Sequence, residues 1–256
     1  MRIVIKVGSS TLTYATGDLN IRHFENLVKV LSDIKNAGHE VVLVSSGAVA
    51  MGMGKLNFFV KPKDMPTKQA CAAVGQCELM HLYDKHFEEY NHDVAQILLT
   101  ADDFRSEERV GNFHNTISRL LELNVLPVIN ENDTVVTSEI KVGDNDTLSA
   151  LVAVQAEADL LVLLSDIDGL YTADPRKDPE AKMISTVDAI TPEIEALAGG
   201  AGSSIGTGGM ATKIKAAKMV TEAGCDMVII NGDRPQLLYD VIDGKAVGTR
   251  FLQSRK

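Results

Sequence analysis

The sequence contains few cysteines, no cluster of basic residues and no long apolar segment, and each absence narrows what the protein can be. The three cysteines, Cys71, Cys77 and Cys225, are odd in number and lack C-x-x-C spacing, which argues against a disulfide framework or a cysteine metal site. We therefore expect reduced, partly buried thiols in a cytoplasmic protein. No apolar stretch approaches the roughly 20 residues that span a bilayer, and the first residues lack the pattern of a secretion signal, so we expect no membrane association.

The chain is acidic, with 25 lysines and arginines against 35 aspartates and glutamates and a formal net charge of −10. Such a chain repels nucleic acid and anionic membranes unless it carries a local basic patch, and the sequence has no Lys/Arg run. An RNA-binding module would need such a patch, so we expect no nucleic-acid partner. Any site for polyphosphate must instead concentrate a few positive groups, which makes single lysines beside glycine-rich turns the candidates to follow.

A length of 256 residues, with 45% hydrophobic and 23% charged residues, fits one large α/β domain or two smaller ones and excludes a disordered chain. Short apolar runs alternate with helical periodicity along the chain, and alternating residues at 134–142 predict a hairpin. The pattern predicts strands at 3–7, 40–44, 94–99, 125–129, 160–164 and 227–230, and helices at 21–34, 48–53, 69–90, 110–123, 144–157 and 210–223. This alternation is typical of a central, mostly parallel sheet covered on both faces.

Polar motifs follow four of the predicted strands directly. They are Lys6-Val7-Gly8-Ser9-Ser10, Ser45-Ser46-Gly47-Ala48, Asn130-Glu131-Asn132-Asp133 and Ser165-Asp166. Ligands of open α/β sheets bind beyond the carboxyl ends of the strands, and those ends meet at one edge. We therefore expect these four motifs to form one site.

The common phosphate-binding signatures are missing. The sequence has no G-x-x-x-x-G-K-[ST] loop, no G-x-G-x-x-G after the first strand and no protein-kinase motif set. Lys6 could still add a point charge to backbone N–H groups of the Gly8-Ser9-Ser10 turn, although a lysine beside a turn is more often simply solvated. The Ser46-Gly47 turn presents N–H groups at a helix start, which suits an anion or merely an ordinary serine N-cap.

Carboxylates and carboxamides are dense on both sides of the predicted hairpin, at 130–133 and at 144–146. Helix capping needs one such side chain, not seven. This density suits recognition of an ammonium and a carboxylate on one amino acid, and it could equally hold Mg²⁺ or orient lysines. The sequence does not indicate which residues contact a metal ion.

The segment 199–209 holds six glycines, at positions 199, 200, 202, 206, 208 and 209, and leads into the predicted helix that carries Lys213. A structural turn rarely needs so many glycines, whereas a lid that closes backbone over phosphates does. Lys213 would then lie in the first helical turn, facing what the loop encloses.

Taken together, these motifs resemble the amino-acid kinase family over nearly the full length of the chain. The resemblance is carried, in order, by Lys6–Ser10, Val44–Ala48, Pro127–Asp133, Lys141–Asp146, Gly169–Pro175 and Gly206–Lys213. The Tyr-Thr-Ala-Asp-Pro segment is shared across the wider family. The Asn-Glu-Asn-Asp and Lys-Val-Gly-Asp-Asn-Asp segments point to the members that phosphorylate glutamate.

The resemblance implies a role for each matching residue. It implies that Lys6 and Lys213 stabilise the transferring phosphate and that Asp146 organises these catalytic lysines. It assigns the amino-acid substrate to Ser46, Gly47, Asn130, Asp133 and Asn145. It assigns ATP to Lys6, Gly8, Ser9, Ser165, Asp166, Tyr171, Asp174, Pro175, Thr207, Gly208, Gly209, Met210, Ala211, Thr212 and Lys213.

The implied fold is a three-layer αβα sandwich, with a single kinase domain over residues 1–256. Its first part, about 1–157, would mainly bind the amino acid, and its second part, about 158–256, mainly the nucleotide. Many family members that phosphorylate glutamate continue into a C-terminal PUA domain of the kind found in RNA-modifying enzymes. We expect none here, because the sequence stops at Lys256, and we expect the kinase motifs to suffice for catalysis.

The implied reaction is the ATP- and Mg²⁺-dependent phosphorylation of the side-chain carboxylate of L-glutamate to L-glutamyl 5-phosphate, the first step of proline biosynthesis. The resemblance also implies feedback inhibition by proline and a homo-oligomer, either a dimer or a tetramer. Two alternatives remain at this point. One is a family member that acts on aspartate, N-acetylglutamate, carbamate or uridylate, and the other is a non-catalytic nucleotide sensor.

Overall fold

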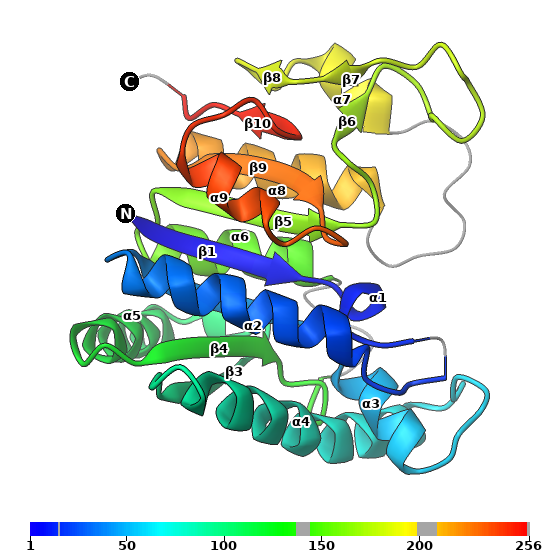
Figure 1. Cartoon of the computed structure of the whole chain (residues 1–256), viewed down its shortest axis with the longest axis vertical. Helices are drawn as coiled ribbons and strands as arrows, with labels where there is room; N and C mark the ends of the chain where they lie inside the picture. The colour runs from blue at the N-terminus through cyan, green and yellow to red at the C-terminus, as the bar shows by residue number, and fades with distance from the viewer. Residues whose placement is uncertain (15, 137–143, 199–208, 255–256) are drawn as a thin grey trace.

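A central sheet of eight strands organises the computed structural model, which describes residues 1–14, 16–136, 144–198 and 209–254 (Figure 1). Its strands are β1 (Arg2–Val7), β2 (Glu40–Ser45), β3 (Val94–Leu99), β4 (Leu126–Glu131), β5 (Leu160–Ser165), β8 (Thr186–Val187), β9 (Asp226–Asn231) and β10 (Thr249–Phe251). They lie in the order β3-β4-β2-β1-β5-β9-β10-β8. Among their pairings only β10 with β9 is antiparallel, so the predicted, mostly parallel sheet is confirmed.

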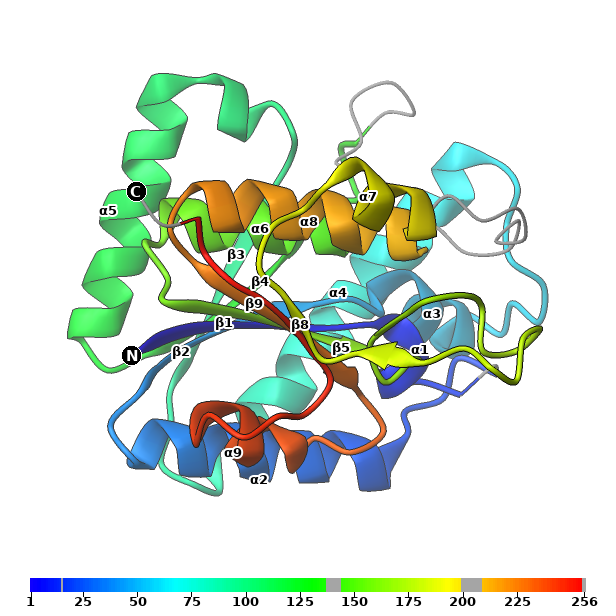
Figure 2. The ribbon, with the colours of Figure 1, turned by 90° about the horizontal axis from the view of Figure 1, so that it is seen from above.

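Helices cover both faces of this sheet, as Figure 2 shows with the sheet seen edge-on. One face packs against α2 (Ile21–Asn36), α3 (Ala48–Lys55), α4 (Met65–Glu88) and α9 (Leu237–Ile242). The other face packs against α5 (Glu107–Glu122), α6 (Asn145–Gln155) and α8 (Met210–Glu222), and α7 (Pro192–Ala198) contacts α8. The expected three-layer αβα sandwich is therefore confirmed.

The alternation of side chains along β1 decides where Lys6 points. Ile3, Ile5 and Val7 lie in the apolar core beneath α2, whereas Val4 lies in the core beneath α6 and α8. Successive strand residues point to opposite faces, so Lys6 follows Val4 toward α6 and α8. Burial of the apolar neighbours fixes this register, because a slip of one residue would turn the whole apolar set outward.

The predicted strands and helices are confirmed, with small differences at their ends. Helix α4 begins at Met65 rather than at 69, because Asp64 caps it by accepting a hydrogen bond from Thr67 N and because Pro66 fits a first helical turn. The predicted hairpin lies mostly outside the described residues. The sequence did not indicate several short elements, namely α1 (Ser9–Leu12), η1 (Asp103–Arg105), β6 (Leu170–Tyr171), β7 (Met183–Ile184), β8, β10, α7 and α9.

The longest helix, α4, has 24 residues and carries polar side chains along much of its length. Across the described ranges, no helix is both long and apolar enough to cross a membrane.

Candidate active site

The carboxyl ends of the parallel strands are bound to one another by backbone hydrogen bonds. Ser46 N donates to Val7 O at 3.1 Å, which links the ends of β2 and β1. Gly232 N donates to Ser165 O at 2.7 Å, which links the ends of β9 and β5. The segments that follow these strands therefore begin at one edge of the sheet, as expected from the four polar motifs.

Three charged side chains meet at this edge. The Nζ atom of Lys6 lies 2.7 Å from Oδ1 of Asp146, and the Nζ atom of Lys213 lies 3.0 Å from Oδ2 of the same carboxylate. The Asp146 side chain is fully buried, and the side chains of the two lysines are only 11% and 6% exposed. We call Lys6, Asp146 and Lys213 the lysine–aspartate trio.

Local sequence explains how α6 and α8 deliver their members of the trio. Asp144 caps α6 by accepting a hydrogen bond from Thr147 N at 2.8 Å, which places Asp146 in the first turn of the helix. Gly209 precedes α8, and Thr212 donates its hydroxyl to Asp146 Oδ2 at 2.9 Å. The starts of α6 and α8 are thereby held together over the end of β1.

The trio is electrostatically unbalanced. Burial by itself would raise the pKa of Asp146, but the charges of Lys6 and Lys213 outweigh burial and lower it. Asp146 is therefore ionised at neutral pH, and two ammonium groups share one carboxylate. Both ammonium groups lie at the edge where ligands of such sheets bind, and this concentration of positive groups favours an anion there.

Asn145, the residue before Asp146, contacts a hydroxyl and a second amide. Asn145 Nδ2 lies 2.6 Å from Ser46 Oγ and 3.2 Å from Asn130 Oδ1, so the structure brings these three predicted substrate residues together. Gly47 has a φ of 106°, in the left-handed region that favours glycine, and it directs the chain from β2 into α3. Asp133 is half-buried in the turn after β4.

Some of the residues predicted for ATP also lie next to members of the trio. The position that a Cβ of Gly8 would take is 3.7 Å from Lys6 Nζ, so the Gly8–Ser9 turn borders the trio. Met210 and Ala211 stand beside Thr212 in the first turn of α8. Thr207 and Gly208 lie outside the described residues.

Of the remaining predicted ATP residues, Ser165 is buried, whereas Asp166, Asp174 and Pro175 are exposed. Ser165 donates its hydroxyl to Asp166 at 3.3 Å, and Asp166 pairs with Arg176 at 3.2 Å. The side chains of Asp166 and Arg176 are both exposed. Asp174 and Pro175 lie in an exposed turn, where Asp174 accepts a hydrogen bond from Arg176 N at 3.0 Å. These contacts link Asp166 and Asp174 through Arg176, but they leave the role of the turn in ATP binding a prediction.

The end of β9 adds a polar group that the sequence analysis did not include. Asn231 donates to Asp168 Oδ1 at 2.8 Å, and Tyr171 donates its hydroxyl to Asp168 Oδ2 at 3.5 Å. Burial and the charge of Asp168 raise the pKa of Tyr171. The signal was available, because Asn231-Gly232-Asp233 is a polar motif that directly follows a predicted strand.

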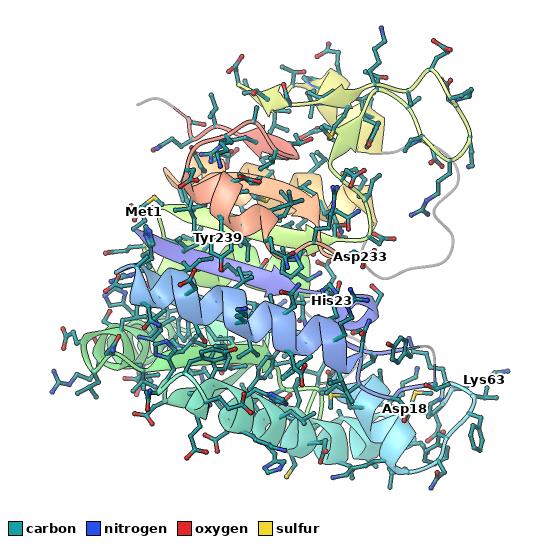
Figure 3. All side chains as sticks on the ribbon, in the orientation of Figure 1. Met1, Asp18, His23, Lys63, Asp233 and Tyr239 are labelled. Atoms are coloured by element: carbon teal, nitrogen blue, oxygen red, sulfur yellow. The ribbon has the colours of Figure 1, made fainter. Side chains whose placement is uncertain are left out.

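His23 was also missed. It lies at the start of α2 and next to Asp233, which belongs to the turn after β9 (Figure 3). Burial lowers the pKa of His23, against the opposing effects of Asp233 and of a hydrogen bond with the Gly232 backbone. The contact links the turn after β9 to α2. No pattern in the sequence predicts that these two segments lie close together.

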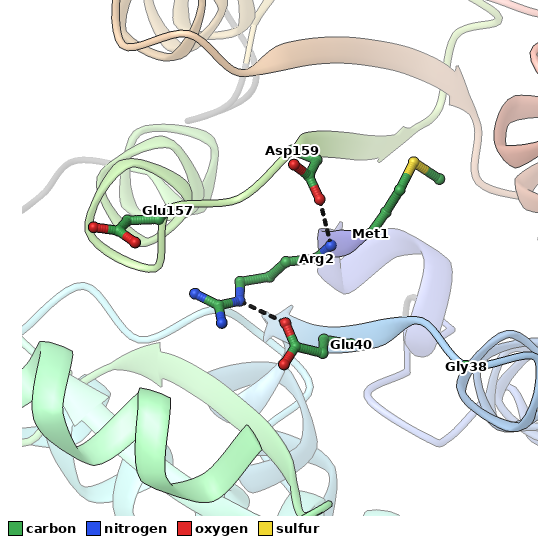
Figure 4. Close-up of a pocket in the computed structure, with 6 residues that line it drawn as sticks. All are labelled: Met1, Arg2, Gly38, Glu40, Glu157 and Asp159. Carbon is green, nitrogen blue, oxygen red and sulfur yellow. Dashed lines mark hydrogen bonds and ion pairs between the residues drawn. The ribbon is translucent and has the colours of Figure 1, made fainter. Parts of the chain in front are cut away.

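The opposite edge of the sheet holds a surface hollow of about 470 Å³ (Figure 4). Arg2 spans it, with its backbone N–H donating to Asp159 at 2.7 Å and its Nε to Glu40 at 2.8 Å. These bonds fix the start of β1 between its two neighbouring strands. The hollow lies at the amino ends of the strands, so we assign it a structural role.

A mostly parallel αβα sandwich with two lysines on one buried carboxylate at its carboxyl edge suits phosphoryl transfer, because positive groups there can stabilise the charge of the moving phosphate. Residues 1–231 match the amino acid kinase family, and the chain belongs to this family.

Two relatives illustrate the similarity. A glutamate 5-kinase of Clostridium tetani is 57% identical over 249 residues, which cover 97% of this chain and 93% of that protein. A glutamate 5-kinase of Carboxydothermus hydrogenoformans is 56% identical over 256 residues, covering 100% of this chain and 68% of that protein.

Among solved structures, the carbamate kinase of Giardia lamblia bound to AMP-PNP has a TM-score of 0.71 at 19% identity, over 99% of this chain and 98% of that chain. The UMP kinase of Ureaplasma parvum has a TM-score of 0.67 at 15% identity, over 98% of both chains. At such identities the likeness establishes the fold, which agrees with the sandwich described above.

Proposed function

We propose that this chain transfers the terminal phosphoryl group of ATP to the side-chain carboxylate of L-glutamate, giving L-glutamyl 5-phosphate in the first step of proline biosynthesis. The observation that carries the proposal is the lysine–aspartate trio beside the amides of Asn130 and Asn145. Identity of 57% and 52% to two clostridial glutamate 5-kinases supports glutamate as the acceptor.

The chemistry needs no general base. A glutamate side chain has a reference pKa of about 4.3 and is already an anion at neutral pH. The obstacle is repulsion between this anion and the polyphosphate. Lys6 and Lys213, held side by side by Asp146, would stabilise the charge of the phosphoryl group while it passes between the two oxygens. Positioning of both substrates supplies the rest.

The two halves of the sequence would divide the binding. The part at about 1–157 contributes the proposed glutamate residues, namely Ser46, Gly47, Asn130, Asp133 and Asn145. The part at about 158–256 contributes most of the proposed ATP residues around Ser165, Tyr171 and α8. The trio stands at the junction, since Lys6 and Asp146 come from the first part and Lys213 from the second.

Mg²⁺ enters the proposal together with ATP. In the described residues no group of three or more His, Cys, Asp or Glu side chains is placed to hold a metal ion, and Asp146 is already paired with two lysines. These residues therefore fit an ion held mainly by phosphate oxygens and water, as Mg²⁺ commonly is in kinases. When bound, it would neutralise part of the phosphate charge.

A coupled assay of ADP release tests the proposed function. We expect turnover with L-glutamate and ATP, and much slower turnover with aspartate, N-acetylglutamate, carbamate or UMP. Hydroxylamine should trap the acyl phosphate product as a hydroxamate, which distinguishes transfer to a carboxylate from simple ATP hydrolysis. ADP release that does not depend on glutamate, or that proceeds better with one of the other acceptors, would refute the proposal.

Feedback and assembly belong to the same proposal. Proline, which carries an ammonium and a carboxylate on one carbon, would bind at the glutamate residues and raise the glutamate KM without changing ATP binding. The protein would form a dimer or tetramer. Initial rates at several proline concentrations and sedimentation velocity measure the two properties independently.

A further inference from the structure

A row of side-chain amides runs from β3, the outermost strand at one side of the sheet, to the proposed glutamate residues. Gln96 on β3 is exposed, and it accepts a hydrogen bond from Gln76 Nε2 of α4 at 3.0 Å. Gln76 Oε1 in turn accepts from Asn130 Nδ2 of β4 at 2.9 Å, and Asn130 Oδ1 accepts from Asn145 Nδ2 at 3.2 Å. Gln76 is 8% exposed and Asn130 is 3% exposed, so water does not compete for the inner bonds.

Backbone groups fix the orientation of the amides in this row. The N–H of Glu131 donates to Asn130 Oδ1 at 2.8 Å, and because an N–H can only donate, the Asn130 oxygen must face it. The NH₂ group of Asn130 must then face Gln76. The carbonyl of Ser45 can only accept, and it lies 3.2 Å from Asn145 Nδ2, which fixes the Asn145 amide in the same way.

We propose that Gln76 is a positioning residue for the amino-acid acceptor and that it acts through Asn130. The inference rests on the proposed function and deepens it. With its NH₂ group turned toward Ser45, Ser46 and Asn130, Asn145 directs its amide oxygen the other way. That oxygen is an acceptor suited to the ammonium group of an amino acid.

Gln76 matters because, in the part of the chain that the structure describes, its side-chain oxygen accepts the hydrogen bond of the buried Asn130 NH₂ group. If the Gln76 oxygen is removed, the buried NH₂ group of Asn130 loses its acceptor. The amide cannot flip, since Glu131 N–H needs the oxygen where it is. Any other rotation that gives the NH₂ group a new partner also moves the shared oxygen away from Glu131 N–H and Asn145, so Asn130 no longer holds Asn145 in place. Gln76 lies on α4, on the opposite face of the sheet from α8, so the lysine–aspartate trio keeps its contacts.

Four variants test this step. Gln76→Met keeps the volume and offers only a weak thioether acceptor in place of the amide oxygen, and Gln76→Asn withdraws the amide by one methylene. In both we expect the KM for glutamate to rise roughly tenfold, the effect of leaving one buried donor unpaired. Gln76→Glu keeps an oxygen toward Asn130, and the exposed Gln96 amide can turn to donate to it, so this variant should restore the KM. Gln96→Ala is the matched control, because water replaces an exposed partner.

The readout is the split between substrates. In Gln76→Met and Gln76→Asn the KM for ATP should stay within about twofold of the unmodified chain, since a general packing defect would move both constants. Titration calorimetry with glutamate alone should reproduce the loss, and thermal melting checks that each variant is folded. If Gln76→Met does not fold, Gln76→Asn and Gln76→Glu still give the comparison.

Two results would overturn the proposal. One is an unchanged glutamate KM in folded Gln76→Met or Gln76→Asn, and the other is an equal rise of the KM for ATP. Failure of the proposed function has a different signature, because it shows in the unmodified chain as a lack of glutamate-dependent ADP release. If the unmodified chain phosphorylates glutamate and the Gln76→Met and Gln76→Asn variants keep its KM for glutamate, only the positioning role of Gln76 is overturned.

Discussion

Lys6 and Lys213 contact opposite oxygens of a single buried carboxylate, although they lie near opposite ends of the chain. Because the two oxygens belong to Asp146, the ammonium groups are held next to each other despite their mutual repulsion. Two ammonium groups that meet on one carboxylate concentrate positive charge at this point, which attracts an anion. The arrangement explains how an acidic chain with a net charge of −10 can bind a polyphosphate.

Removal of either ammonium group should abolish most of the activity. We expect Lys6→Ala and Lys213→Ala each to lower kcat by roughly 10²- to 10³-fold, the usual effect of removing one preorganised donor to a developing charge. Lys215→Ala is the control, because Lys215 lies two residues further along α8 and is exposed. The measurement is glutamate-dependent ADP release by variants with an unchanged far-ultraviolet spectrum. Near-normal turnover in a folded Lys6 or Lys213 variant would remove that lysine from the mechanism.

Asp146 should contribute to stability in a pH-dependent way. The lysines lower its pKa in the folded state, so its contribution is fully present above the unfolded pKa of about 3.9 and is lost as the pH falls through the lower folded value. Asp146→Asn removes the buried carboxylate that the two lysines share and should lower the free energy of unfolding by about 3 kcal/mol at pH 7.

Urea unfolding of both proteins at pH 7 and near pH 3 measures this difference. The gap between the unmodified chain and Asp146→Asn should narrow at the lower pH. A gap that is absent at pH 7, or that widens in acid, would show that the trio adds no net stability through ionised Asp146.

Asp133 should affect glutamate and not ATP. Asp133 lies in the turn directly after β4, the strand that carries Asn130. A carboxylate at this place suits the ammonium group of an amino acid. We expect Asp133→Ala to raise the KM for glutamate roughly tenfold, as loss of one charge-assisted hydrogen bond would. Titration calorimetry should give the same affinity for ATP as the unmodified chain. The exposed neighbour Thr134→Ala is the control, and a matched loss for ATP would disprove a glutamate-specific role.

The trio was expected from the resemblance to the amino-acid kinase family, and local rules of the sequence indicate where each of its members lies. Alternation along the first strand determines which face of the sheet Lys6 points to. Acidic residues in a first turn indicate the start of the helix that carries Asp146, and the glycine-rich segment indicates the start of the helix that carries Lys213. The carboxyl-edge rule then brings the three together. That the two lysines share the Asp146 carboxylate was expected only from the family resemblance, because the local rules left the role of the carboxylates at 144–146 open.

Gln76 could not be found in this way. In the sequence it is one polar residue of a long helix, and its partner Asn130 lies on a distant strand. Its importance comes from burial and from one tertiary hydrogen bond, and neither leaves a periodic signal. The strands β6 to β8 were missed for a related reason, since elements of two residues are too short to show an alternation.

The three free cysteines should react at very different rates. Cys77 is exposed on α4, whereas Cys71 and Cys225 are buried. Burial raises the pKa of Cys71, and burial with the charges of Asp226 and Asp159 raises the pKa of Cys225 to about 12. Because the thiolate is the reactive form, a disulfide reagent at pH 8 should modify one thiol in the folded protein and all three in denaturant. Rapid native labelling that persists in Cys77→Ser would contradict the burial of the other two.

Helices α3 and α4 pack so closely that no side chain fits at Gly52 or Gly75. A Cβ at Gly75 would lie 1.7 Å from the carbonyl oxygen of Ala48, and a Cβ at Gly52 would lie 1.8 Å from that of Cys71. Ala48 is the first residue of α3 and directly follows the Gly47 turn, so Gly75→Ala would displace one wall of the proposed glutamate site.

We expect Gly75→Ala to lower the free energy of unfolding by about 3 kcal/mol through overpacking, and to raise the KM for glutamate more than that for ATP. Gly111→Ala is the matched control. Gly111 is also helical, in α5, but nothing lies within 4 Å of an added Cβ. Alanine should therefore stabilise that helix by about 0.5–1 kcal/mol. Urea unfolding measures both effects. If the two alanine variants shifted stability in the same direction, helix propensity and not the close approach of α3 to α4 would govern Gly75.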